Sequence, residues 1–198
     1  MMITDEEIRS RTACEATQLL NEAVRQLIAP SLILDLMKPW MEADQPNFLR
    51  IAAVRNFCML GIVVNLYRVI ETRDHFLKDF LFTEEELRNL GFPSIEECLG
   101  GPEKMKWLEI LRHQFAGHAM GRWAGNDQPG RLIPAKLLGQ ALRETGILEL
   151  PEFAKRLVDE IAAKLENFVQ ELRRLFPAVD KFIKEDYPLE LEKGRLGK

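Results

Sequence analysis

Helix boundary signals follow one another along almost the whole chain, and they constrain the fold more than any other feature. Thr4 and Glu7 have the spacing of a capping box, which predicts a helix that Pro30 closes after about Ala29. Comparable signals predict further helices at about 33–37, 47–80, 84–90, 103–120, 134–145, 151–176 and 177–187. No segment alternates between apolar and polar residues as a strand does. The sequence therefore predicts an all-α protein, a bundle of five to seven helices.

Length and composition are those of an ordinary globular domain. The chain has 198 residues, of which 46% are hydrophobic and 29% charged. This length suits one domain, which we expect to cover residues 1–187, followed by a polar tail at 188–198. Within the 47–80 helix, the run from Phe57 to Val64 is apolar on every side, as in a helix central to a core.

Several features predict a soluble cytoplasmic protein without a membrane partner. The first seven residues include three acidic residues and no basic one, unlike a secretory leader. The apolar run from Phe57 to Val64 is too short to span a bilayer. Cys14, Cys58 and Cys98 are far apart and odd in number, which indicates neither a disulfide framework nor a CxxC metal site.

Charge is distributed unevenly along the chain. The formal net charge is −4 at pH 7, which disfavours a protein that coats nucleic acid non-specifically. From Gly101 to Lys136, however, six basic residues stand against three acidic ones, so this segment is +3 and the remainder −7. A locally basic site on an acidic body suits a protein that handles one RNA feature.

The basic segment contains two of the three histidines, His113 and His118, next to Arg112. A histidine titrates near neutral pH and a guanidinium is always charged, a combination suited to the cleavage of a phosphodiester. On an ideal helix, Arg112 and His118 would lie about 120° apart and about 9 Å along the axis. Two readings of this motif remain open.

In the structural reading, His118 continues the apolar stripe of Leu111 and Phe115 at the edge of the core, and Arg112 extends along its flank. In the functional reading, glycines on both sides of His118 let it turn toward a cleft. The loop that follows could contact phosphates and bases, through residues that include Arg122, Trp123 and Asn126.

The spacing from Arg112 to His118, with the polar His113 after the arginine, resembles the Arg-x(4–6)-His signature of the HEPN superfamily. The stretch from Asn65 to Glu71, which contains Arg68, is similar to the Arg-apolar-apolar-acid segment of abortive-infection-type HEPN proteins. Arg68 and His75 also fit the spacing of the signature, but Val69 replaces the polar residue expected after the arginine.

The resemblance implies a metal-independent endoribonuclease that cuts single-stranded RNA in phage defence or a toxin–antitoxin system. His118 would be the general base or acid, Arg112 would stabilise the phosphorane, and His113 would orient the substrate or Arg112. Arg68, Arg122 and Asn126 would support substrate binding. The products would carry a 2′,3′-cyclic phosphate and a 5′-OH. The resemblance also implies a homodimer whose motifs face one cleft, and an antitoxin or neighbouring-gene product as a further partner.

The competing prediction is a helical module with the same fold that binds protein, RNA or nucleotide without cleavage. Both kinds of protein keep an arginine and a histidine, so the motif alone leaves the choice open. The sequence contains no HExxH and no glycine-rich phosphate loop, and His113 and His118 are five residues apart rather than four. We therefore expect no metal and no cofactor.

Overall fold

The computed structural model describes residues 4–41, 48–115, 135–146 and 152–186, and it confirms the predicted all-α class. These residues form eight α-helices and one π-helical segment, and no strand occurs among them. In chain order the elements are α1 (Asp5–Met41), α2 (Phe48–Thr72), η1 (Arg73–Lys78), α3 (Glu84–Asn89), α4 (Ile95–Leu99), α5 (Pro102–Phe115), α6 (Ala135–Glu144), α7 (Glu152–Leu175) and α8 (Pro177–Asp186). The residues expected to form the tail, 188–198, lie outside the described residues.

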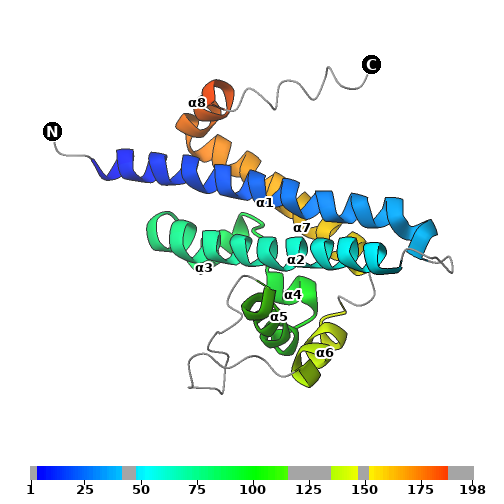
Figure 1. The fold of residues 1–198 in the computed structure, drawn as a ribbon. Helices are drawn as coiled ribbons and strands as arrows, with labels where there is room; N and C mark the ends of the chain where they lie inside the picture. Colours follow the sequence, from blue (N-terminus) through cyan, green and yellow to red (C-terminus); the bar gives the residue numbers. More distant parts are fainter. Residues whose placement is uncertain (1–3, 42–47, 116–134, 147–151, 187–198) are drawn as a thin grey trace, which may run out of the picture.

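A long antiparallel pair of helices, α1 and α2, organises the bundle (Figure 1). Helix α7 packs against α1. Helix α5 packs against α2, and α6 packs against α5. Leu157, Ile161, Leu165 and Val169 recur at four-residue steps along α7, and all four are buried. Helices α2 and α5, which lie within the predicted 47–80 and 103–120 helices, pack against each other.

The expectation that Pro30 ends the first helix was wrong, because α1 continues through both Pro30 and Pro39 to Met41. A proline inside a helix removes one backbone hydrogen bond and crowds the preceding turn. Pro30 is buried, and it faces Gly61 of α2 so closely that a Cβ on Gly61 would lie 3.0 Å from the Pro30 Cγ. Packing of the ring against α2 offsets the lost hydrogen bond, so 33–37 is not a separate helix.

Two helical glycines provide a test of this close approach. Gly139 in α6 has no atom within 4 Å of a Cβ built on it, so Gly139→Ala should stabilise the fold by about 0.5–1 kcal/mol. Gly61→Ala should lose this gain, because the new methyl group presses on Pro30. Urea unfolding of both variants measures the difference, and an equal gain at the two positions would contradict the packing described for Pro30.

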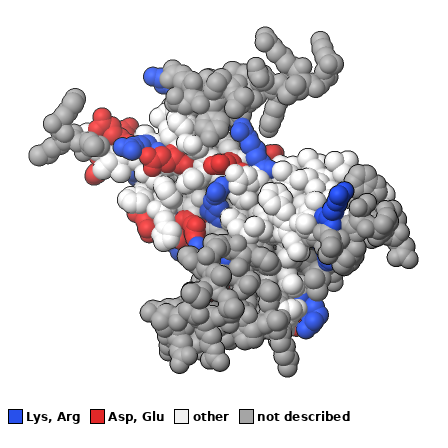
Figure 2. All heavy atoms as spheres, viewed as in Figure 1, with Lys and Arg blue, Asp and Glu red and all other residues white. Residues whose placement is uncertain are grey.

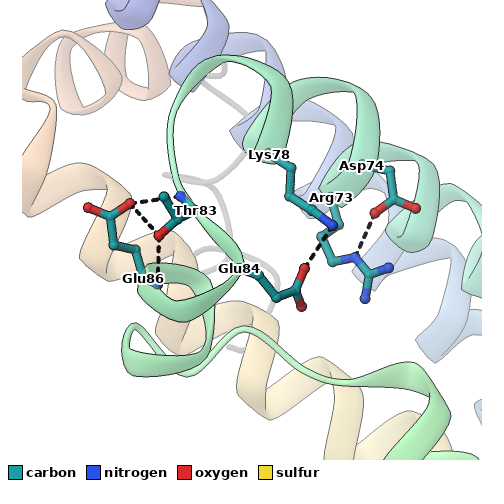
Figure 3. A network of polar contacts seen from close by, with 6 residues as sticks. All are labelled: Arg73, Asp74, Lys78, Thr83, Glu84 and Glu86. Atoms are coloured by element: carbon teal, nitrogen blue, oxygen red, sulfur yellow. Dashed lines mark hydrogen bonds and ion pairs between the residues drawn. The ribbon is translucent and has the colours of Figure 1, made fainter.

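Two capping boxes form, of which the one at Thr4 was predicted from the sequence. The backbone N–H of Thr4 donates to the Glu7 carboxylate at 2.8 Å, and the N–H of Glu7 donates to Thr4 Oγ1 at 3.2 Å. Thr83 and Glu86 repeat the arrangement at the start of α3, with distances of 2.7 and 3.2 Å (Figure 3). Gly91 follows α3 with φ of 76°, the left-handed conformation expected of a glycine after a helix.

The predicted 47–80 helix is interrupted by η1, a π-helical segment that begins directly after α2. Its ends are tied by ion pairs: Arg73 Nε lies 2.9 Å from the Asp74 carboxylate, and Lys78 Nζ lies 2.9 Å from Glu84 at the start of α3 (Figure 3). π-Helical turns are rare in proteins, and those that occur are often found at functional sites.

The middle of α2 is not buried on every side, which corrects the expectation for Phe57–Val64. Cys58, Ile62 and Val63 are buried, but the side chain of Phe57 is 66% exposed. Four apolar residues in this part of the helix pair are exposed: Leu32 and Leu36 on α1, and Val54 and Phe57 on α2. Figure 2 shows an uncharged area over this part of the helix pair.

By length and composition, one helical stretch in the described part of the chain could cross a membrane. It spans Ala53–Lys78, and its most apolar window has a mean hydropathy of 1.4 with 39% of the window buried. The core helix of a globular protein has the same composition, and this stretch packs against α1 and α5.

Candidate functional site

The structure describes two of the six candidate site residues completely. Arg112 lies near the end of α5, and Arg68 lies on α2. His113 belongs to α5, but its side chain is outside the described residues. His118, Arg122 and Asn126 fall within 116–134, also outside the described residues.

Arg112 joins α5 to α2 through an ion pair. Its Nη2 donates a hydrogen bond to Oε1 of Glu71, which is near the end of α2. The side chains of Arg112 and Glu71 are 34% and 47% exposed, so the pair lies at the surface. At this exposure a single ion pair contributes only about 0–1 kcal/mol to stability, and its main effect is to fix the position of the guanidinium.

Tyr67, one helical turn before Glu71, provides a second contact. The guanidinium carbon of Arg112 lies 4.6 Å from the centroid of the Tyr67 ring, within cation–π distance. Burial raises the pKa of Tyr67 above its usual range, the carboxylates of Glu109 and Glu71 raise it further, and Arg112 lowers it. The phenol therefore stays protonated at neutral pH and acts as a neutral platform for Arg112.

Within the described part of the chain, these contacts orient Arg112 without saturating it. A guanidinium carries five N–H donors in a planar fork that matches the oxygens of a phosphate. The hydrogen bond to Glu71 occupies one of these donors, and the aromatic contact uses the face of the group. The side chain of Arg112 can therefore keep its contacts with α2 while it binds an additional anion.

Arg68 lies beside this pair. Its Nη1 donates to Oε1 of Gln26 on α1 at 2.9 Å. Arg68 and Glu71 are three residues apart on one helix, so they are neighbours on the same side of α2. The guanidinium of Arg68 is thus directed to α1, while the guanidinium of Arg112 bonds the carboxylate of Glu71 from α5.

Tyr67 and Glu71 were not among the candidate site residues predicted from the sequence. Both belong to the segment whose resemblance drew attention to Arg68, and their spacing of four residues places them on one side of a helix. This spacing was the available signal. It could not show which basic residue the two side chains would contact, because Arg112 is 41 positions after Glu71.

A second polar cluster, at Cys98, does not form a nucleophile. Cys98 Sγ lies 3.4 Å from Glu160 Oε1 and 3.8 Å from Lys164 Nζ, and these two residues pair with each other at 2.7 Å. Burial and the nearby Glu160 raise the pKa of Cys98 to about 11, while Lys164 lowers it. The thiolate is therefore a minor form at neutral pH.

Comparison of the chain with protein-family models, with curated proteins and with solved structures found no match. Within the ranges that the structure describes, no group of three or more histidine, cysteine, aspartate or glutamate side chains is placed to hold a metal ion. The site is thus characterised by its own geometry: an exposed arginine held on α2 by one carboxylate and one aromatic ring.

Proposed function

We propose that this protein is an endoribonuclease of the HEPN type, which cleaves single-stranded RNA without a metal ion. The observation that carries the proposal is the position of Arg112, fixed at the surface by Glu71 and Tyr67, where the contacts with described residues leave donors for a phosphate. Arg112 stabilises the negative charge that develops on the phosphorane oxygens. His118 exchanges a proton with the 2′-oxygen or the 5′-oxygen.

The biological setting belongs to the same proposal. Enzymes of this type act inside the cell on host or phage RNA, which fits a cytoplasmic protein of a defence or toxin–antitoxin system. An antitoxin or another neighbouring gene product would hold the activity in check. Arg122, Asn126 and His113 would contact the substrate around the cleavage position.

The proposal is tested with purified protein and a single-stranded RNA oligonucleotide in EDTA. We expect cleavage products with a 2′,3′-cyclic phosphate and a 5′-OH, because the 2′-hydroxyl is the nucleophile and the catalytic groups are side chains. The same oligonucleotide with deoxyribose should remain intact. Full cleavage of the deoxyribose version would contradict the proposed mechanism, since that substrate lacks the attacking hydroxyl.

A helical binding module is the second candidate, and the ion pair itself favours it. Glu71 partly neutralises Arg112, as it would if the pair only joined α5 to α2. Such a module would bind RNA or protein without cutting it. Retention of a labelled RNA on the protein, with no cleavage of any sequence tried, would identify the module.

We also propose that the enzyme is a homodimer, supported by the exposed side chain of Phe57 on α2. An ideal helix places Arg68 within about 20° of the direction of Phe57, so this apolar side chain and the candidate site share one side of α2. A second copy packed there would cover this side chain and bring the two Arg112 sites toward one interface.

Phe57→Asp should weaken this dimer, because it places a charge in an apolar contact. Sedimentation velocity should show a dimer for the wild type and a larger monomer fraction for the variant at the same concentration. Lys106→Asp, at an exposed position on α5, is the matched control and should leave the distribution unchanged. A wild type that stays monomeric at high concentration would remove the dimer from the proposal.

A further inference from the structure

A cavity at the surface lies where η1, α3, α4 and α7 meet, and the proposed function leaves it unused. Its volume is about 270 Å³. Five charged side chains from these four elements line it: Arg73, Glu84, Arg88, Glu97 and Lys164. None of them belongs to the group of Arg112, Glu71 and Tyr67, so the cavity is separate from the candidate site.

Three of these five charges are balanced by an ion-pair partner. The partners are Asp74 for Arg73, Lys78 for Glu84 and Glu160 for Lys164, and Figure 3 shows the first two pairs. The hydrogen bond from Lys78 lowers the pKa of Glu84 more than burial raises it, and Arg73 lowers it further, so this carboxylate stays ionised at neutral pH. Each pair is neutral as a unit, and the three pairs together leave no net charge in the cavity.

Arg88 and Glu97 carry the two remaining charges, which are opposite in sign. Both residues are exposed, and neither side chain has a hydrogen-bond or ion-pair partner among the described residues. A guanidinium only donates hydrogen bonds, and an ionised carboxylate only accepts them. A simple anion that approached Arg88 would also meet the negative charge of Glu97, and a simple cation would meet the positive charge of Arg88. A ligand with one group of each sign gains a charge-assisted hydrogen bond from both residues.

Apolar side chains form another part of the lining. Leu87, Phe92 and Pro93 line the cavity and are otherwise buried. The ring of Phe92 packs edge to face with Phe168 at 4.9 Å between centroids, and the backbone N–H of Phe92 donates to the carbonyl of Leu87 at 3.0 Å. A volume of about 270 Å³ equals that of about nine water molecules at about 30 Å³ each, below the roughly 300–1,000 Å³ of pockets for drug-sized ligands. The cavity thus suits a small ligand with an apolar part.

We propose that this cavity binds a small apolar α-amino acid as its zwitterion. The carboxylate of the amino acid bonds Arg88, its ammonium group bonds Glu97, and its side chain lies against Leu87 and Phe92. An α-amino acid combines two opposite charges and one apolar group in a small molecule, which are the three features that the lining matches. This inference does not depend on the proposed ribonuclease function, because the two sites share no residue.

Isothermal titration calorimetry on the full-length protein compares L-leucine with two analogues: 4-methylpentanoate, which lacks the ammonium group, and 3-methylbutylamine, which lacks the carboxylate. The wild type should bind leucine at least about tenfold more tightly than either analogue, because each analogue loses one charged hydrogen bond. Arg88→Gln should lose the preference over 3-methylbutylamine and keep the other, and Glu97→Gln should do the reverse. Glu85→Gln, exposed on α3 and not part of the lining, is the matched control and should keep both preferences.

The crossed pattern of lost preferences is the decisive readout, because a folding defect would weaken the binding of all three compounds equally. Wild-type protein that binds neither leucine, valine nor methionine at millimolar concentration would overturn the inference. Binding of leucine with both preferences intact in Arg88→Gln and Glu97→Gln would also overturn it, since the amino acid would then bind elsewhere. The presence or absence of RNA cleavage tests the proposed function alone, so the two failures remain distinguishable.

Discussion

Replacement of His118 by alanine is expected to lower the rate of RNA cleavage by about 10²–10⁴-fold, because it removes a group that moves a proton in the transition state. The melting temperature should stay close to that of the wild type if His118 faces the substrate. Rates on one RNA oligonucleotide, together with thermal unfolding curves, measure both effects. A steep fall in melting temperature, combined with a wild type that cuts no RNA, would instead identify His118 as a structural histidine at the edge of the core.

Arg112→Lys tests the residue of the motif that the structure describes, with the same measurements of cleavage rate and stability. Lysine keeps the positive charge near Glu71, but it lacks the planar fork that contacts a phosphate at two points. We therefore expect a large loss of cleavage with little loss of stability. Arg174→Lys, at an exposed ion pair on α7, is the matched control and should cleave normally. If Arg112→Lys cleaved as fast as the control, Arg112 would have no role beyond joining α5 to α2.

Phe168→Ala is expected to cause the largest loss of stability, about 3–5 kcal/mol, because it removes a fully buried ring. The ring of Phe168 packs edge to face with Phe92 at 4.9 Å and with Phe82 at 6.3 Å between centroids. A loss of this size is a large fraction of the 5–15 kcal/mol typical of a folded domain. The midpoint of urea denaturation measures it.

Phe80→Ala is the matched control, because it makes the same change at a side chain that is 53% exposed. Surface substitutions usually change stability by no more than about 0.5 kcal/mol, so this variant should unfold near the wild-type midpoint. Similar losses for the two variants would contradict the packing described around α7.

Local interactions made much of the fold predictable. The capping boxes at Thr4 and Thr83 each involve residues three positions apart, so the sequence contains every group that takes part. The apolar stripe of α7 was predictable for the same reason, because a helix places Leu157, Ile161 and Leu165 on one side whatever packs against them.

The structure differs from the sequence prediction where a distant segment decides the outcome. Pro30 normally ends a helix, but Gly61, 31 positions away, leaves room for its ring against α2, and α1 continues. The run from Phe57 to Val64 is uniformly apolar, so its sequence could not reveal that the side of α2 with Phe57 stays exposed.

The candidate site divides in the same way. The sequence by itself determined that Arg112 lies on a helix and that Tyr67, Arg68 and Glu71 share a helical segment, because these relations depend on spacing along one element. Only the tertiary structure decided that Glu71 is the partner of Arg112 and that Tyr67 lies beneath its guanidinium. The physical reason is that such a contact depends on the rotation of α5 relative to α2, which the packing of their buried faces sets and no local pattern encodes.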